Sequence, residues 1–214
     1  MSDLLTSRDA LVEAGRHLVS LGLSPGTSGN ISVRVGDRMI ITPTNESMGE
    51  LDPSRLAVLS LSGEHLEGPR PSKEFTLHRA FYRRLPEAGA VVHLHSVHAV
   101  AAACLPPWSA ASAVAPITPY FVMRVGQTPL ISYAPPGDSA QADELEALDV
   151  PCRAALLANH GSVVAADDLG AAVNAAVELE EACKLSLLTA GRPVSLLTHE
   201  QAVSLAAKYG SFWG

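Results

Sequence analysis

Apolar residues recur in the N-terminal part of the chain with the period of an amphipathic helix. The residues of this stripe are separated by three, four and three positions: Leu11, Ala14, Leu18 and Leu21. A period near 3.6 predicts one helical face directed towards a core. Ser7 is expected to cap this helix, and Gly22 to end it. The next segment, residues 24–29, is rich in hydroxyl groups and glycine, which predicts a loop.

Short strand-like runs and longer helical stretches then follow one another. Runs of aliphatic and β-branched residues predict strands at residues 31–35, 39–42, 56–61, 88–95, 154–158 and 162–165. Helical periodicity and terminal signals predict helices at residues 71–84, 98–104, 169–189 and 200–208, the last of them capped by Thr198. Residues 106–119 are rich in Pro and Ala without a clear period and are interpreted as a loop.

Several of these strands are too close in the chain for a purely parallel sheet. Gly36-Asp37 between the first two strands suits a tight hairpin turn, whereas parallel neighbours need much longer crossover connections. No linker, internal repeat, dinucleotide-binding glycine motif or Walker-type loop is visible. The chain is therefore predicted to be one α/β domain over residues 1–214 with a largely antiparallel central sheet.

The composition supports a packed core and excludes two classes of protein. Hydrophobic residues make up 47% of the 214 residues and charged residues 17%, which excludes a disordered chain. The 15 Lys and Arg against 22 Asp and Glu leave a formal net charge of −7. Because attraction to phosphate backbones requires a basic surface, a general nucleic-acid binder is also excluded. A local cationic pocket for one small anion remains open.

The cysteines and the apolar segments indicate a soluble, cytoplasmic protein with no membrane partner. Cys104, Cys152 and Cys183 are odd in number and form no Cys-x-x-Cys pair, so we expect buried, reduced side chains. The most apolar segment, residues 89–104, is shorter than the ~20 residues of a membrane helix and contains histidines. Asp3, with no apolar block after it, argues against a secretory signal.

Two histidines on one predicted strand are candidate metal ligands. His93 and His95 are two positions apart, so their side chains point to the same face of the strand. Their neighbours are apolar, and burying an unpaired imidazole among apolar residues is costly. A bound metal would compensate for this cost. Core histidines satisfied by hydrogen bonds remain an alternative.

His160, at the end of another predicted strand, and Glu74, at the start of a predicted helix, could complete such a site. Three imidazoles and one carboxylate suit zinc. Spacing alone does not select these ligands, because the chain has eight histidines. The others are expected to lie on the surface or to be satisfied in the core: His17, His65, His78, His98 and His199.

Five short motifs occur in the order typical of one protein family. They are Ser28-Gly29-Asn30-Ile31-Ser32, Ile41-Thr42-Pro43-Thr44, Pro71-Ser72-Lys73-Glu74, Ala90-Val91-Val92-His93-x-His95 and Asn159-His160-Gly161. Together, over nearly the whole chain, they resemble the class II aldolase/adducin family, typified by L-fuculose-phosphate aldolase. The resemblance implies a three-layer αβα domain and a cyclic homotetramer with active sites at subunit interfaces. It also implies one Zn²⁺ per subunit, bound by Glu74, His93, His95 and His160.

The phosphate-binding loops of that family correspond to three short segments of this chain. The resemblance implies that the substrate phosphate contacts six residues: Gly29, Asn30, Thr44, Asn45, Ser72 and Lys73. Backbone N–H groups, hydroxyls and a helix N-terminus can bind an anion without net positive charge, and Lys73 adds a point charge. Tyr120 matches an aldolase tyrosine that donates a proton from the neighbouring subunit, with a packing role as the alternative. Tyr209 could close over the site or only anchor the C-terminus.

Departures from the aldolase pattern resemble one subgroup, the 3-oxo-tetronate 4-phosphate decarboxylases. Asn45 and Lys73 replace smaller aldolase residues, and residues 117–126 also match this subgroup. The resemblance implies loss of CO2 through a metal-bound ene-diolate to give dihydroxyacetone phosphate, with Glu74 as acid/base. Sugar-phosphate aldol cleavage or epimerisation on the same site remains an alternative. A non-catalytic, adducin-like binding domain is a third, which the four retained ligand positions disfavour.

Overall fold

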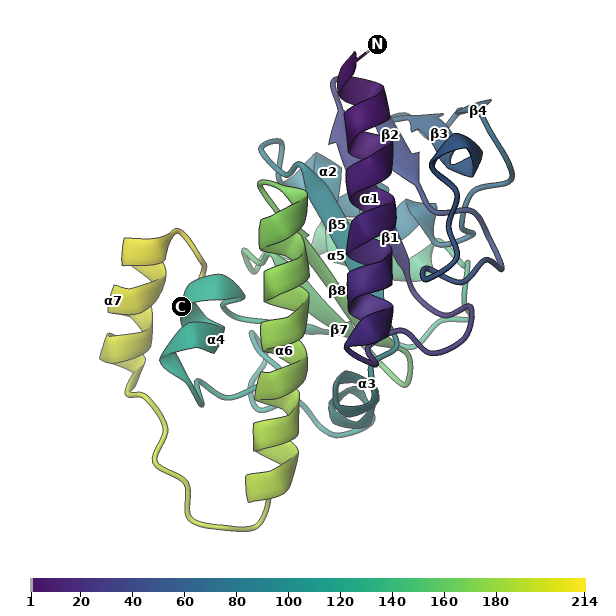
Figure 1. Ribbon diagram of the computed structural model, residues 1–214. Helices are drawn as coiled ribbons and strands as arrows, with labels where there is room; N and C mark the ends of the chain where they lie inside the picture. Colours follow the sequence, from purple (N-terminus) through teal and green to yellow (C-terminus); the bar gives the residue numbers. More distant parts are fainter. Residues whose placement is uncertain (1) are drawn as a thin grey trace.

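A mostly antiparallel sheet of eight strands forms the centre of the computed structural model, which describes residues 2–214 (Figure 1). Its strands are β1 (Asn30–Val35), β2 (Arg38–Ile41), β3 (Ala57–Ser60), β4 (His65–Glu67), β5 (Ala90–Leu94), β6 (Leu130–Ile131), β7 (Ala154–Leu157) and β8 (Gly161–Ala166). The spatial order is β4-β3-β2-β1-β5-β8-β7-β6. The two-residue β6 pairs in parallel with β7, and the other neighbours pair antiparallel, as the sequence predicted.

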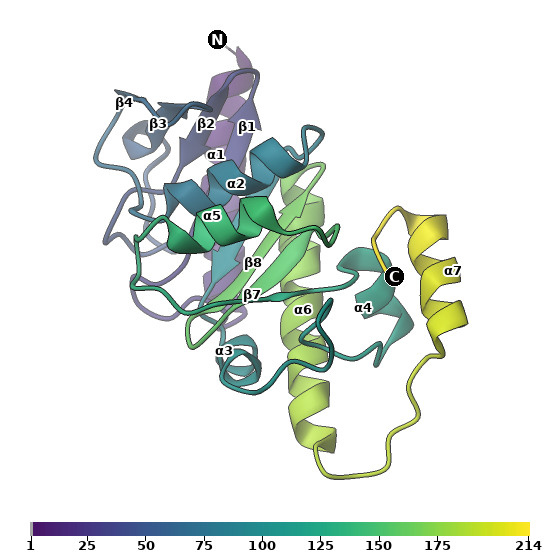
Figure 2. The same cartoon turned by 180° about the vertical axis from the view of Figure 1, so that it is seen from behind.

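Helices cover both faces of this sheet. They are α1 (Ser2–Ser20), the 3-10 turn η1 (Pro53–Arg55), α2 (Phe75–Arg84), α3 (Val97–Ala103), α4 (Pro119–Arg124), α5 (Ala140–Ala147), α6 (Leu169–Thr189) and α7 (His199–Tyr209). Helices α1 and α6 lie in front of the sheet in Figure 1, and α2 and α5 lie in front of it in the opposite view (Figure 2). The layers are therefore helix, sheet and helix, which confirms the predicted αβα architecture.

The central strand β5 is buried on both of its faces. Ala90, Val92 and Leu94 belong to the core shared with α1, α3 and α6, whereas Val91 belongs to the core shared with α2 and α5. The sequence of a strand that is covered on both faces is a nearly continuous run of apolar residues. His93 shares the face of Val91, because side chains alternate along a strand. The α2 side of the sheet therefore holds the first polar group of the site.

The strongest helix predictions are confirmed together with their terminal signals. Helix α6 spans residues 169–189 as predicted, and Asp168 caps it by accepting a hydrogen bond from the backbone N–H of Ala171. Thr198 and Gln201 form a capping box at the start of α7. The prediction for the first helix was wrong at both ends: α1 begins at Ser2, so that Ser7 lies inside it, and it ends at Ser20. Leu21 lies beyond this helix and is exposed.

Several short helices and strands were not predicted from the sequence. Helix α4 begins at the end of the segment interpreted as a loop, and Thr118 caps it through the N–H of Phe121. Strands β4 and β6 and helix α5 were also not predicted. Elements of two to eight residues carry too few positions for a period to be recognised, and pairing with neighbours decides them.

The cysteine prediction is confirmed at two positions and wrong at one. Cys152 and Cys183 are buried, but Cys104 is exposed. Cys104 caps the C-terminus of α3 where the chain leaves the core, and its Sγ accepts a hydrogen bond from the side-chain amide of Asn159 at 3.4 Å. Among residues 2–214, no helix combines the length and the apolar character needed to cross a bilayer.

Candidate functional site: a Glu/His3 cluster beside a small polar pocket

The four proposed metal ligands meet at one edge of the sheet. His93 and His95 lie at the C-terminal end of β5, and His160 lies in the turn between β7 and β8. Because Leu94 pairs with Ser162, the start of β8 lies beside the end of β5. Glu74 comes from the other direction, directly before α2. One ligand atom from each residue lies within 4.8 Å of the others, and we call these four residues the Glu74–histidine cluster.

The spacing within this cluster matches that around a small metal ion. The Nε2 atoms of His93 and His95 are 3.0 Å apart. The Glu74 carboxylate reaches Nε2 of His93 at 3.4 Å and Nε2 of His160 at 3.1 Å. Four ligand atoms at about 2.0 Å from a tetrahedral ion lie about 3.3 Å from one another. Three contacts within the cluster are therefore already close to the spacing of ligand atoms around one ion.

Hydrogen bonds at the rear of the cluster determine which nitrogen is free to bind. Nδ1 of His93 is 2.8 Å from the carbonyl oxygen of Ser162, which can only accept, so Nδ1 carries the proton. With Nδ1 as the donor to Ser162, Nε2 is the nitrogen that faces the cluster and can bind a metal. His160 is buried; its Nδ1 has no hydrogen-bond partner among the described residues, and its Nε2 has only the contact with the Glu74 carboxylate. A neutral imidazole offers one nitrogen lone pair, which a metal ion in the cluster would satisfy, so the donor set fits a divalent metal.

The ionisation states also suit metal binding. Burial alone would raise the pKa of the Glu74 carboxyl, but contacts with His160 and His93 outweigh it and hold that pKa well below its usual range. Burial, reinforced by the neighbouring His93 and His160, lowers the pKa of His95 to about 4. At neutral pH the cluster therefore contains an ionised carboxylate and a neutral His95, the forms in which these groups bind metals.

A glycine allows the turn that carries His160 to approach β5. A Cβ on Gly161 would collide with the carbonyl oxygen of Leu94. Asn159, two residues earlier, has a φ of 58° in the left-handed region, which asparagine tolerates better than most residues. The Asn159-His160-Gly161 motif thus brings the third imidazole within reach of the other two.

A pocket of about 250 Å³ adjoins the cluster. Its lining consists of Thr27, Ser28, Gly29, Asn30, Pro43, Thr44, Asn45, Ser72, Lys73, Glu74, His95 and Pro136. All six residues proposed for phosphate binding are among them. Lys73 is the only Lys or Arg in this lining. Glu74 and His95 belong to both the pocket and the cluster.

Local backbone conformation explains one departure from the aldolase pattern. Asn45 has a φ of 61°, in the left-handed region that glycine adopts without strain. Asparagine is among the few residues that tolerate this conformation, so it can stand where the resemblance implies a smaller residue in the aldolases. The replacement keeps the loop conformation and adds an amide beside the pocket.

Two residues of the pocket lining were not predicted from the sequence. Thr27 and Pro136 line the pocket, but neither was proposed as a site residue. Gly137 lies against the aliphatic part of the Lys73 side chain, so this loop shapes the cationic end of the pocket. The sequence Pro135-Pro136-Gly137 predicts a turn, so a loop at this position could have been predicted.

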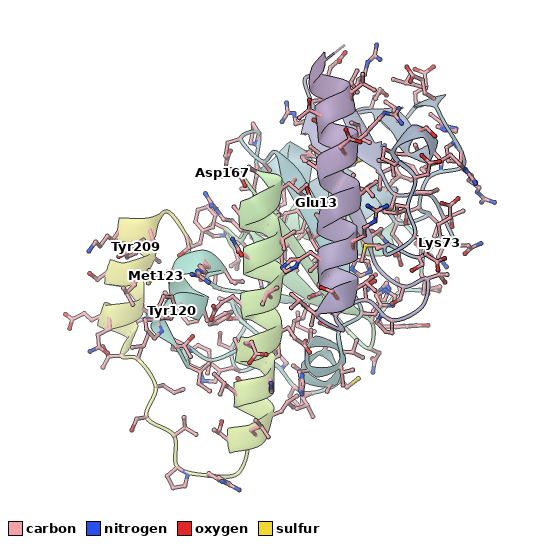
Figure 3. All side chains as sticks on the ribbon, in the orientation of Figure 1. Glu13, Lys73, Tyr120, Met123, Asp167 and Tyr209 are labelled. Atoms are coloured by element: carbon pink, nitrogen blue, oxygen red, sulfur yellow. The ribbon has the colours of Figure 1, made fainter. Side chains whose placement is uncertain are left out.

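Two tyrosines considered in the sequence analysis lie away from this pocket. Tyr120 on α4 is 56% exposed, and Tyr209 on α7 is also exposed. Figure 3 shows both on the side of the molecule opposite to Lys73. Within one chain, the structure does not bring either ring to the Glu74–histidine cluster.

The remaining histidines are placed as expected. His17, His65 and His199 are exposed. His98 is bonded to the buried carboxylate of Glu180, and His78 is fully buried with both ring nitrogens hydrogen-bonded. None of the five enters the Glu74–histidine cluster.

Comparisons with known proteins agree with the motifs. Residues 9–187 match the family described as Class II Aldolase and Adducin N-terminal domain. The 3-oxo-tetronate 4-phosphate decarboxylase of Pectobacterium atrosepticum is 40% identical over 201 residues, covering 94% of this chain and 92% of that protein. The L-fuculose phosphate aldolase of Escherichia coli K12 is 31% identical over 206 residues, covering 94% and 93%. The crystal structure of YgbL from Escherichia coli superposes with a TM-score of 0.90 at 38% identity, covering 94% of this chain and 98% of that one.

Proposed function

Because this chain belongs to the class II aldolase/adducin family, we propose that it is a metal-dependent lyase that removes CO2 from a 3-oxo-tetronate 4-phosphate. The observation that carries the proposal is that the Glu74–histidine cluster borders a small pocket of hydroxyls, amides and Lys73. A phosphorylated oxo acid requires both features: a cation beside its ketone and an anion site at its other end. The relatives named as decarboxylases support this choice of substrate.

The metal centre is assigned to the four clustered residues. Glu74, His93, His95 and His160 would hold one divalent ion, for which Zn²⁺ suits three imidazoles and one carboxylate. When bound, the metal supplies positive charge that stabilises the negative charge developing on the substrate oxygens as the C–C bond breaks. The chain contributes orientation, because the carbonyl of Ser162 holds His93 and the amide of Asn30 holds Glu74.

The phosphate end of the substrate is assigned to the three loops that line the rest of the pocket. Ser72 and Lys73 precede Glu74, the N-cap residue of α2, so an anion there would meet the N-terminal end of the helix dipole. Gly29, Thr44 and Asn45 add backbone, hydroxyl and amide donors from two other loops. Donors aimed in this way can bind a phosphate in an acidic chain that lacks a broad basic face.

Loss of CO2 leaves an electron pair on the substrate carbon, which must then accept a proton to give dihydroxyacetone phosphate. We assign the proton donor to Tyr120 of the partner subunit, because this exposed ring lies away from the pocket of its own chain (Figure 3). Glu74, ionised in the cluster, is the candidate acid/base within the chain. The assignment of Tyr120 entails a homo-oligomer, for which we propose a tetramer with active sites at its interfaces.

The experiment compares two substrates on the purified, metal-loaded protein. Incubation with 3-oxo-tetronate 4-phosphate is expected to release CO2, and incubation with L-fuculose 1-phosphate to release no aldehyde at a comparable rate. Aldol cleavage is the second candidate, since an L-fuculose phosphate aldolase is 31% identical over nearly the whole chain. Aldehyde release as fast as CO2 release would replace the first candidate by the second.

A separate experiment tests whether Lys73 binds the substrate phosphate. Lys73→Ala removes the one ammonium group of the pocket lining and should weaken binding of the phosphorylated substrate about tenfold or more. Binding of the dephosphorylated analogue should change much less. Equal losses for the two compounds would show that Lys73 does not bind the phosphate.

A further inference from the structure

Five buried polar side chains form a continuous hydrogen-bonded chain beneath the Glu74–histidine cluster. The Tyr82 hydroxyl is 2.8 Å from Ser32 Oγ, which is 2.8 Å from Nδ1 of His78. Nε2 of His78 is 2.5 Å from Oδ1 of Asn30. The amide nitrogen of Asn30 donates to Oε2 of Glu74 at 2.8 Å. All five residues are buried, and we call them the polar chain.

The polar chain results from matched periods in one helix and one strand. Glu74, His78 and Tyr82 are four positions apart and form one stripe along α2, whereas Asn30 and Ser32 are two positions apart on one face of β1. Four residues of a helix rise about 6 Å, and two residues of a strand about 6.7 Å. The two sets therefore interleave, with each strand residue between two helix residues. Apolar side chains such as Phe81 fill the same layer around them.

The chemistry of its ends determines the direction of every hydrogen bond. The Glu74 carboxylate can only accept, so the NH2 group of Asn30 faces it and the amide oxygen faces His78. That oxygen can only accept, so Nε2 of His78 carries the proton. In a neutral ring Nδ1 is then an acceptor, so Ser32 donates to it and Tyr82 donates to Ser32. All four hydrogen bonds run towards Glu74.

We propose that His78 is a positioning residue: as the neutral Nε2–H tautomer, it orients the amide of Asn30 so that this amide holds the Glu74 carboxylate in the metal-binding cluster. The proposal rests on the proposed function in one respect, that Glu74 is a metal ligand. Rotation of the Asn30 amide by 180° would turn its oxygen against the carboxylate. The Nε2–H group of His78 disfavours that orientation, because it would then face an NH2 group.

A residue that positions a metal ligand through hydrogen bonds is expected to affect metal affinity. Loss of hydrogen bonds to metal ligands typically costs about 10- to 100-fold in affinity. The test compares two replacements of His78 in the full-length, metal-free protein, with Zn²⁺ alone as the probe in a competition titration against a chelating dye. His78→Leu removes the donor and should weaken Zn²⁺ binding about tenfold or more. His78→Gln retains an N–H donor near the position of Nε2 and should restore the affinity to within about threefold of the original. Equal losses in both variants would overturn the proposal.

A double-mutant cycle tests whether His78 acts through Asn30. Asn30→Ala should itself weaken Zn²⁺ binding, and adding His78→Leu to it should cause no further loss. Additive losses would overturn the proposal, since they would mean that the two residues act independently. Ser112→Ala is the matched control for loss of a buried hydroxyl outside the site, and it should leave Zn²⁺ affinity unchanged.

The tautomer can be measured in the unmodified protein, which removes any dependence on the folding of variants. Long-range ¹H–¹⁵N correlation of ¹⁵N-histidine-labelled protein should show the His78 ring protonated on Nε2 only, with the signal assigned by its loss in His78→Gln. Protonation on Nδ1, or on both nitrogens at neutral pH, would overturn the proposal. No readout here uses a sugar phosphate, so failure of the decarboxylation assay and failure of this proposal are distinguishable.

Discussion

Two buried glutamates approach the segment from His93 to His98 from opposite faces of the sheet, and their surroundings differ. The Glu180 carboxylate on α6 accepts four hydrogen bonds, from the hydroxyl of Ser96, the backbone N–H groups of His98 and Ala99, and Nδ1 of His98. The Glu74 carboxylate accepts one from the amide of Asn30, and its other neighbours are the imidazole nitrogens of the cluster. The Glu180 carboxylate therefore has four protein donors, whereas the Glu74 carboxylate has one amide donor and faces imidazole nitrogens that can also bind a metal.

Burial and ionisation do not distinguish the two glutamates. Burial opposes ionisation of both, yet hydrogen bonds from Ser96, His98 and Ala99 hold the pKa of Glu180 below its usual value, as the contacts of Glu74 do for that carboxyl. The hydrogen bonds of Glu180 cap the N-terminus of α3, where Ser96 at the N-cap position makes no side-chain capping bond. Glu180 therefore has a structural role. The convergence of three imidazoles on the Glu74 carboxylate is the feature that indicates a ligand site.

The largest expected effect distinguishes the histidines of the two regions. His95→Ala should abolish stoichiometric metal binding and activity, because about 10–16 kcal/mol for a four-ligand zinc site corresponds to about 2.5–4 kcal/mol per ligand. His98→Ala, three positions along the chain, removes an imidazole bonded to Glu180 and should retain the metal. Metal content by atomic emission and turnover are measured on both variants. Full metal content in His95→Ala would show that the ligand set is wrong.

The next effect distinguishes the carboxylates themselves. Glu180→Gln places an amide N–H against groups that donate, and it should lower the free energy of unfolding by about 2 kcal/mol with or without metal. Glu74→Gln should cost ~1 kcal/mol or less in the metal-free protein but greatly weaken Zn²⁺ binding. Urea denaturation of both variants checks this, with the exposed Glu181→Gln as the control. A similar loss of metal-free stability in the two variants would remove the distinction.

Acid should destabilise the metal-free protein through two histidines near Glu74, His78 and His95. Burial lowers the pKa of His78 to about 3 and that of His95 to about 4, below the ordinary histidine value of 6.5. Between pH 6.5 and 4 the unfolded chain therefore binds protons that the folded chain does not, so the free energy of unfolding falls as pH falls. Each group contributes a slope of up to about 1.4 kcal/mol per pH unit.

This acid sensitivity can be attributed to one residue. His78→Gln should reduce the slope between pH 6 and 4.5 by up to about 1.4 kcal/mol per pH unit, measured by urea denaturation at a series of pH values. Ser32→Ala, which keeps the buried imidazole, is the control and should lower stability without flattening the slope. An unchanged slope in His78→Gln would mean that His78 is protonated to the same extent in both states.

The smallest expected effect concerns the loop at Gly137, which contacts Lys73 in the pocket beside Glu74. A Cβ on Gly137 would lie 3.1 Å from Cδ of Lys73, so Gly137→Ala should displace this side chain and raise KM about fourfold, or roughly 0.8 kcal/mol. Gly191→Ala is the matched control, because Gly191 also has a positive φ, of 75°, but a Cβ there would have no atom within 4 Å. Equal KM values for the two variants would show that the Gly137 loop does not position Lys73.

Periodicity in the sequence was sufficient for the long elements. Helix α6, with 21 residues, has enough turns for its pattern and its terminal signals to agree, so its predicted bounds are those of the structure. Strands β1 and β2 were predicted to within a few residues because the Gly36-Asp37 turn separates them. Helix α4 and strand β6, with six and two residues, could not be predicted, since such short elements depend on what they pack against.

The site was recognisable from motifs but not from spacing. His93-x-His95 predicted two side chains on one face of a strand, and that pairing is a local property. The third imidazole and the carboxylate are 65 and 19 positions from His95 and His93 respectively. Their selection from the other histidines required a resemblance to a known family. His78 was expected only to be satisfied in the core, and its link to Glu74 through Asn30 was not foreseen.

The sequence by itself determined the residue types, the longer elements and the mostly antiparallel arrangement, because these follow from local periodicity and short connections. Only the tertiary structure decided which polar groups meet. The pairing of Asn30 with His93 across β1 and β5, and the packing of α2 on that face, bring Glu74 and the polar chain beneath the imidazoles. The same packing brings Glu180 to its donors on the opposite face. Hydrogen bonds and metal ligation act over about 3 Å, so they depend on sheet register and helix packing, which no single segment encodes.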